Sequence, residues 1–90
     1  MDQVPTYMVE RYLPGSTDAT FAEAVRRAAS AAGQMTDQGE PTRYLGSVYV
    51  PIEECSFCCF EADDAAAVEE ANRRAGVAYW RVVRAVLIER

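Results

Sequence analysis

The chain has 90 residues, half of them hydrophobic, and its formal net charge is −5. This size and composition predict one globular domain over residues 1–90, without the ~18–20 consecutive apolar residues that a membrane-spanning helix needs. The nine basic residues are all arginine and form no positive stripe, which argues against nucleic-acid binding, and the chain lacks histidine, the commonest general base and transition-metal ligand.

The first segments predict a strand followed by a helix. Residues 5–13 (PTYMVERYL) are rich in aromatic and β-branched side chains and end at a Pro-Gly pair, as expected of a strand closed by a turn. Residues 16–35 carry apolar side chains at helical spacing behind a cap at Thr17 or Asp18. Gly33 is expected to end this helix.

The middle of the chain predicts two further strands. Residues 36–41 are polar and contain a glycine and a proline, so we expect a loop. Residues 42–50 (TRYLGSVYV) predict the second strand, and residues 56–62 (SFCCFEA) predict the third. A tight acidic connection joins them.

The last segments predict a second helix and a final strand. Asp63 and Asp64 are expected to cap a helix with an apolar stripe, and Gly76 is expected to end it. Residues 77–89 (VAYWRVVRAVLIE) are mostly β-forming and predict the last strand.

The order β-α-β-β-α-β predicts an α+β, ferredoxin-like fold, with a four-stranded antiparallel sheet and both helices on one face. The first and third strands become the central neighbours, and their side chains alternate between the two faces. Apolar side chains are expected beneath the helices: Val9, Leu13, Cys58 and Phe60. Others are left on the uncovered face: Glu10, Tyr12, Cys59 and Glu61.

The uncovered face is expected to carry Met8, Phe57 and Tyr49 as well, which makes it too apolar to remain exposed to water. In this architecture the usual cover is a second copy of the same sheet. The sequence therefore predicts a homodimer, a dimeric α+β barrel with a lined cavity between its two sheets.

Glu10 and Glu61 are the main candidates for chemistry, because they fall on adjacent strands and on the same predicted face. Two carboxylates in a partly dry cavity cannot both ionise freely, so one could exchange protons, or both could bind a hard metal ion through oxygen. The alternative is the commoner one, that each carboxylate pairs with an arginine. The candidate partners are Arg11, Arg74, Arg81 and Arg84.

The three cysteines favour a structural role. Cys55 and Cys58 have the spacing of a redox pair or half a zinc site, but residues three apart on a strand point to opposite faces. Cys58 is predicted to lie in the core, and Cys59 is the thiol expected in the cavity. An odd cysteine count, with no secretory signal at the start, predicts a cytoplasmic protein without a disulfide framework.

Several motifs occur together in a distinctive order: VERYLPG (9–15), YLGSVYVP (44–51), CFEA (59–62) and ANRRAG (71–76). Over residues 8–88 the chain resembles a family of small actinobacterial proteins known as nickel-responsive and nickel-binding. The resemblance implies a ferredoxin-like fold, self-association and a metal-binding role, with nickel as a possible cofactor. In this chain Glu10, Glu61 and Cys59, with Tyr12 as a further oxygen donor, are the side chains left to bind a metal.

Three functions remain open at this point. The first is a homodimer that binds a small ligand or metal ion, with Glu10 and Glu61 as polar contacts and Tyr12, Cys59 and Tyr49 as walls. The second is a cofactor-independent isomerase, cyclase or monooxygenase that uses a cavity carboxylate as general base, although no residue is assigned as catalytic. The third is a protein-interaction module. Phosphate loops, nucleophile elbows and catalytic triads are absent from the sequence.

Overall fold

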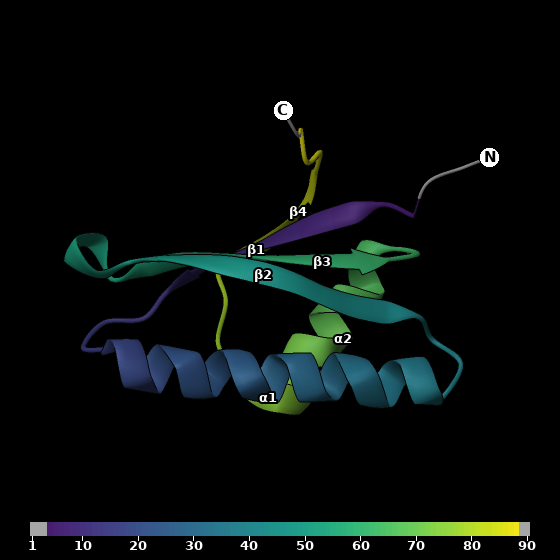
Figure 1. The fold of residues 1–90 in the computed structure, drawn as a ribbon, viewed down its shortest axis with the longest axis horizontal. Helices are drawn as coiled ribbons and strands as arrows, with labels where there is room; N and C mark the ends of the chain where they lie inside the picture. Colours follow the sequence, from purple (N-terminus) through teal and green to yellow (C-terminus); the bar gives the residue numbers. More distant parts are fainter. Residues whose placement is uncertain (1–3, 89–90) are drawn as a thin grey trace.

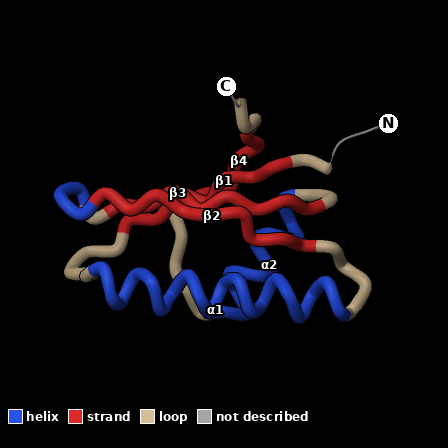
Figure 2. Tube along the Cα trace, in the orientation of Figure 1, coloured by secondary structure: helices blue, strands red, loops and turns tan. Residues whose placement is uncertain are grey.

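The computed structural model describes residues 4–88. Its elements, in chain order, are β1 (Thr6–Tyr12), α1 (Asp18–Asp37), β2 (Thr42–Val50), the short 3-10 helix η1 (Pro51–Glu53), β3 (Cys55–Ala62), α2 (Ala65–Ala75) and β4 (Arg81–Ala85). The strands form one layer, and α1 and α2 form a second layer on one side of it (Figures 1 and 2). Neither helix has the length and apolar character to span a bilayer.

The four strands form one sheet in the order β2-β3-β1-β4. All three neighbouring pairs are antiparallel, and β1 and β3 are the central strands. This confirms the predicted ferredoxin-like α+β fold, because each helix crosses between two strands that have one other strand between them.

α1 begins as predicted and ends later than predicted. Thr17 caps it, and the backbone N–H of Thr17 in turn donates to the Thr20 hydroxyl at 2.8 Å. The predicted end at Gly33 is wrong. A single glycine costs a helix only about 1 kcal/mol, and the neighbouring Ala32 and Met35 are buried against the sheet, so packing carries the helix through to Asp37.

α2 has the predicted ends. The Asp64 carboxylate accepts a hydrogen bond from the Ala67 backbone N–H at 2.9 Å. Gly76 closes the helix in the left-handed conformation with φ of 68°, which glycine adopts without a steric penalty.

β4 is shorter than predicted. The expected strand covered residues 77–89, whereas β4 runs only from Arg81 to Ala85. Among the described residues its partner strand is β1, which offers the five positions Thr6–Glu10, so residues 86–88 continue past the start of β1 without a paired strand. Residues 77–80 form the connection from α2, and residue 89 lies outside the described residues.

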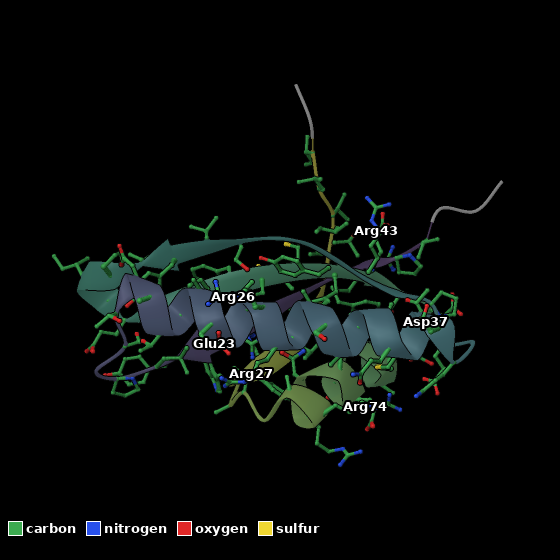
Figure 3. The ribbon with its side chains drawn as sticks, turned by 60° about the horizontal axis from the view of Figure 1, so that its bottom comes forward. Glu23, Arg26, Arg27, Asp37, Arg43 and Arg74 are labelled. Atoms are coloured by element: carbon green, nitrogen blue, oxygen red, sulfur yellow. The ribbon has the colours of Figure 1, made fainter. Side chains whose placement is uncertain are left out.

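The core lies between the helices and the two central strands. Val9, Met35, Phe60 and Val68 have no exposed surface. Alanines on both helices let them lie close to the sheet, and the outward surface of α1 is charged, with Arg26 donating to Glu23 at 2.9 Å (Figure 3). One face of the sheet is therefore sealed by the chain itself.

Candidate functional site

The opposite face of the sheet has no element of the described chain over it; we call it the open face (Figure 1). On β3 every second residue is buried, and Cys55, Phe57, Cys59 and Glu61 are the half-buried residues between them. On β1 the buried residues are Val9 and Arg11, which leaves Met8, Glu10 and Tyr12 on the open face. The predicted alternation of these two strands is confirmed, because antiparallel pairing places Met8 opposite Cys59 and Glu10 opposite Phe57.

An apolar hollow lies in the middle of the open face. Its volume is about 440 Å³, and its main lining residues are Met8, Leu45, Val48, Phe57, Cys59 and Leu87. Thr6, Leu45 and Leu87 also line a neighbouring hollow of about 730 Å³ that contains the charged residues Arg43, Glu61 and Arg84. The centre of the open face is thus apolar, and one end of it is charged.

Both candidate glutamates are engaged by arginines. Glu10 receives two hydrogen bonds from Arg81, at 2.9 and 3.0 Å, and these raise the pKa of Arg81 above its ordinary value. Glu61 lies 3.7 Å from Arg43. The alternative that each carboxylate pairs with an arginine describes the structure, although Arg43 was not among the expected partners.

The two glutamates do not form a carboxylate pair within one chain. Glu61 lies opposite Thr6 in the β1–β3 register, and Glu10 lies opposite Phe57. Four residues at about 3.3 Å each separate them by roughly 13 Å along the strands. They share a face as expected, but they lie towards its opposite ends.

Tyr49 is the site candidate that lies on the other face, so its predicted position as a cavity wall is wrong. Its ring stacks on Phe21 of α1 with centroids 4.7 Å apart, and its hydroxyl is 2.8 Å from that of Ser16. The cause is a β-bulge between Tyr44 and Gly46, which adds one residue to β2 and reverses the alternation after it. Gly46 adopts φ of 154° there, a conformation that favours glycine.

The bulge also explains one of the site residues that the sequence analysis missed. Val48 lines the hollow because the extra residue turns it to the open face, whereas Leu45, directly after Tyr44, and Leu87, beyond the end of β4, line it independently of the bulge. Gly46 inside an otherwise continuous strand pattern is the signal that could have revealed the bulge. Tyr12, in contrast, lies at the end of the open face as expected and is 61% exposed.

The cysteines divide between the two faces as predicted. Cys58 is buried beneath the helices, where its sulfur accepts a hydrogen bond from the Ser47 hydroxyl at 3.0 Å. Cys55 and Cys59 lie on the open face. Burial, and then the neighbouring Cys58 thiol, raise the pKa of Cys59 above its ordinary value, so its thiol stays protonated at neutral pH.

These side chains do not make a metal centre within one copy. Over residues 4–88, no three histidine, cysteine, aspartate or glutamate side chains lie close enough to share an ion. Glu10 and Glu61 each pair with an arginine, and Cys59, which lies between them along the strands, has too few donor side chains close to it to share an ion. Nickel favours imidazole and thiolate donors, and the chain has no histidine. The donors of a single copy therefore do not fit a nickel centre.

Comparison with solved structures supports the fold. The crystal structure of SCO4226 from Streptomyces coelicolor A3(2) aligns with a TM-score of 0.74 and 18% sequence identity, covering 93% of this chain and 99% of that one. At this identity the likeness concerns the fold alone. No curated protein sequence matches the chain.

Comparison with protein families gives the closer relationship. A family profile described as nickel responsive protein SCO4226-like matches residues 7–84, which takes in every strand and helix except the first residue of β1 and the last residue of β4. The chain therefore belongs to the SCO4226-like family of nickel-responsive proteins.

Proposed function

We propose that two copies of this chain pack through their open faces and enclose an apolar cavity that binds a small, largely hydrophobic ligand. The observation that carries the proposal is the hollow of about 440 Å³ on a sheet face that the described chain leaves uncovered. Small-molecule sites typically measure about 300–1,000 Å³ and are lined mainly by apolar side chains. Two such hollows brought together fall within this range.

The distribution of polar groups on the open face supports a protein interface. Met8, Phe57 and Val48 lie at its centre, while the ion pairs of Glu10 and Glu61 lie towards its ends. Stable interfaces have this arrangement, with few charges in the middle and polar groups at the rim. The arginines of both ion pairs are more than half exposed, so a second copy can cover the centre while these cations keep contact with water at the rim.

The exposed apolar residues of the described chain also favour a cover on this side. None of the large ones lies on α1 or α2: they are Val4, Tyr12, Val48, Ile52, Trp80, Val86, Leu87 and Ile88. Tyr12, Val48 and Leu87 of this set lie on the open face, and a monomer that kept them in water would be prone to association. A two-fold pair buries these side chains on both copies at once. Ile52 lies on η1 and does not line the hollow.

The geometry favours a binding protein over an enzyme with a carboxylate base. A general base needs an oxygen that can reach the substrate proton. Both oxygens of Glu10 accept hydrogen bonds from Arg81, and Glu61 faces Arg43. The only support for catalysis is then an analogy with other proteins of this fold, and a fold does not imply a function.

The test uses the dye 1-anilinonaphthalene-8-sulfonate as an apolar probe and sedimentation to determine the oligomeric state. We expect the wild-type protein to be a dimer that binds the dye saturably, at about one site per dimer. Phe57→Arg places a charge in the hollow and should abolish both dimer and dye binding. Ile52→Arg changes an equally apolar side chain that is 92% exposed on η1, and should preserve both. A monomeric wild type, or dye binding unchanged in Phe57→Arg, would contradict the proposal.

Nickel binding is a second candidate, favoured by the family to which the chain belongs. Since one copy does not supply a donor set, binding would require Cys59 and glutamates from both copies of the dimer. Calorimetric titration with nickel chloride tests this, with Cys59→Ser as the matched variant. Heat that disappears in Cys59→Ser would support a shared thiolate site. Absence of heat at millimolar nickel would remove the nickel candidate and leave the apolar cavity unaffected.

A further inference from the structure

We infer that residues Val86–Ile88, which we call the arm, pack against the second copy and clasp the dimer. The inference rests on the homodimer proposed above and concerns the part of the chain that holds it together. The arm follows β4, whose last paired residue is Ala85 opposite Thr6. Within residues 4–88 it has no strand partner and belongs to no regular element.

The arm is the most exposed apolar run in the described chain. Val86, Leu87 and Ile88 are consecutive and are 75%, 67% and 87% exposed. Single exposed apolar residues are normal on protein surfaces, but three in a row are not, unless they serve a contact. The helix layer offers a comparison, since its outward surface carries ion pairs such as Glu23 with Arg26.

The arm lies where a partner must meet it. It rises from the sheet on the side opposite the helices (Figures 1 and 2). Leu87 lines both hollows of the open face, whereas Val86 lines only the charged one, and Ile88 lines neither. Leu87 and Val86 therefore hold the arm beside the copy's own face, and Ile88 extends beyond both hollows. A sheet laid on the open face has to lie alongside them.

The size of the open face favours a contribution from the arm. The sheet has four strands about 4.8 Å apart, and seven residues, the length of β1, at about 3.3 Å give a projected face of roughly 440 Å². A standard stable interface buries about 800 Å² of accessible surface on each partner. Side-chain relief raises the accessible area above the projection, and the three large apolar side chains of the arm bring the interface closer to that size.

A second copy is the occupant that fits, because one chain carries both complementary parts. The arm provides protruding apolar side chains, and the open face provides an apolar hollow lined by Met8, Phe57 and Cys59. In a two-fold pair each copy contributes its arm to the other, so both arms and both hollows are covered in one step. A partner of another kind, bound to a single chain, would cover one arm and one hollow.

The experiment compares the dimer dissociation constants of three proteins by sedimentation velocity over a dilution series. The arm variant carries Val86→Ser and Ile88→Ser and keeps Leu87, so the lining of the apolar hollow is unchanged. The control carries Ile52→Ser, which removes a side chain of similar exposure from η1. We expect the arm variant to raise the dissociation constant at least about tenfold and the control to leave it unchanged. If the wild type does not dissociate on dilution, the rate of subunit exchange gives the same comparison.

The outcomes separate this inference from the proposed function. A wild-type dimer with an arm variant of equal affinity would overturn the arm and leave the dimer intact. A wild-type protein that stays monomeric at all concentrations would overturn both. At concentrations where both proteins are monomeric, we expect the wild type and the arm variant to unfold at the same urea concentration. A lower stability of the monomeric arm variant would show that the arm packs on its own copy. If the serine variant is unfolded, Val86→Ala with Ile88→Ala repeats the test with smaller changes.

Discussion

The two faces of the sheet are built from alternate residues of the same strands, yet the described helices cover only one of them. Phe60 and Phe57 lie three positions apart on β3 and point in opposite directions. Phe60 has no exposed surface, because α1 and α2 cover it, whereas Phe57 lines a hollow that no described element covers. A phenylalanine thus contributes to the core on one face and, in the proposed dimer, to association on the other. Burial within the chain, rather than hydrophobicity, decides which role it has.

The charges on the two faces differ in the same way. Among residues 4–88, the covered face buries one charged side chain, that of Arg11, which is 2% exposed. Its described hydrogen bonds go to neutral oxygens, those of the Asn72 side chain and, at 3.2 Å, the Ala78 carbonyl. The open face instead pairs each carboxylate with an arginine whose side chain is more than half exposed. A buried charge needs fixed partners, while a rim charge can exchange them.

The largest expected effect comes from breaking the covered face. Phe60→Ala should lower the free energy of unfolding by about 3–5 kcal/mol, because it removes a fully buried ring and leaves a cavity. Phe57→Ala should change the unfolding of the monomer by less than about 1 kcal/mol, since the ring is only partly buried there. Urea denaturation followed by circular dichroism, at concentrations where the chain is monomeric, measures both.

For the affinity of the proposed dimer we expect the opposite ranking of the two phenylalanines. Phe57→Ala should weaken self-association, and a milder core variant, Phe60→Leu, should leave it near the wild-type value once the protein is folded. Equal losses of monomer stability for Phe57→Ala and Phe60→Ala would mean that the two faces do not differ in the way described here.

A smaller effect is expected from the buried arginine. Asn72→Ala removes the acceptor for Arg11 and should cost about 2–3 kcal/mol of unfolding free energy, because a desolvated guanidinium loses a partner. The double variant Arg11→Met with Asn72→Leu should recover most of that loss, since replacing both members of a buried polar pair with apolar groups is often nearly neutral. A thermodynamic cycle over the four proteins measures the coupling. A double variant as unstable as the sum of the single ones would show that Arg11 and Asn72 act independently.

Local signals in the sequence are enough to predict the order of elements and most of their ends. Asp64 and Gly76 mark the ends of α2 because capping and left-handed glycine are properties of a few neighbouring residues. Strand alternation is equally local, so the faces of β1 and β3 follow from Val9 and Phe60 being apolar. Gly33 misleads because the cost of one glycine is outweighed by packing against a sheet that lies far away in the sequence.

The candidate site is harder to predict because it depends on register. Glu10 and Glu61 share a face by alternation, but only the pairing of β1 with β3 shows that four positions separate them. Tyr49 changes face because of one extra residue in β2, and Arg11 is buried although the alternation of its strand gives no sign of its partner on α2. Each of these positions depends on the register between two strands, and the sequence of one strand alone does not determine that register.

The smallest expected effect concerns the charged outer surface of the helix layer. Hydrogen bonds from Arg74 and Arg73 to Glu70, at 2.8 and 2.7 Å, hold the pKa of that carboxyl below its ordinary value of 4.5. The folded state therefore favours ionised Glu70. Its stabilisation is complete above pH 4.5 and is lost as the pH falls through the lowered value, because the unfolded chain then binds the proton more readily.

Glu70→Gln should accordingly flatten the dependence of stability on pH just below 4.5 and change little at pH 7 beyond the loss of exposed ion pairs. The matched variant Glu69→Gln removes the same charge from the neighbouring position, which makes no described hydrogen bond to either arginine. Urea midpoints between pH 3 and 7 measure the slopes. Equal flattening in both variants would assign the effect to net charge rather than to Arg73 and Arg74. Neither change touches the open face, so self-association at pH 7 should stay constant while this slope changes, which separates the two faces by a second observable.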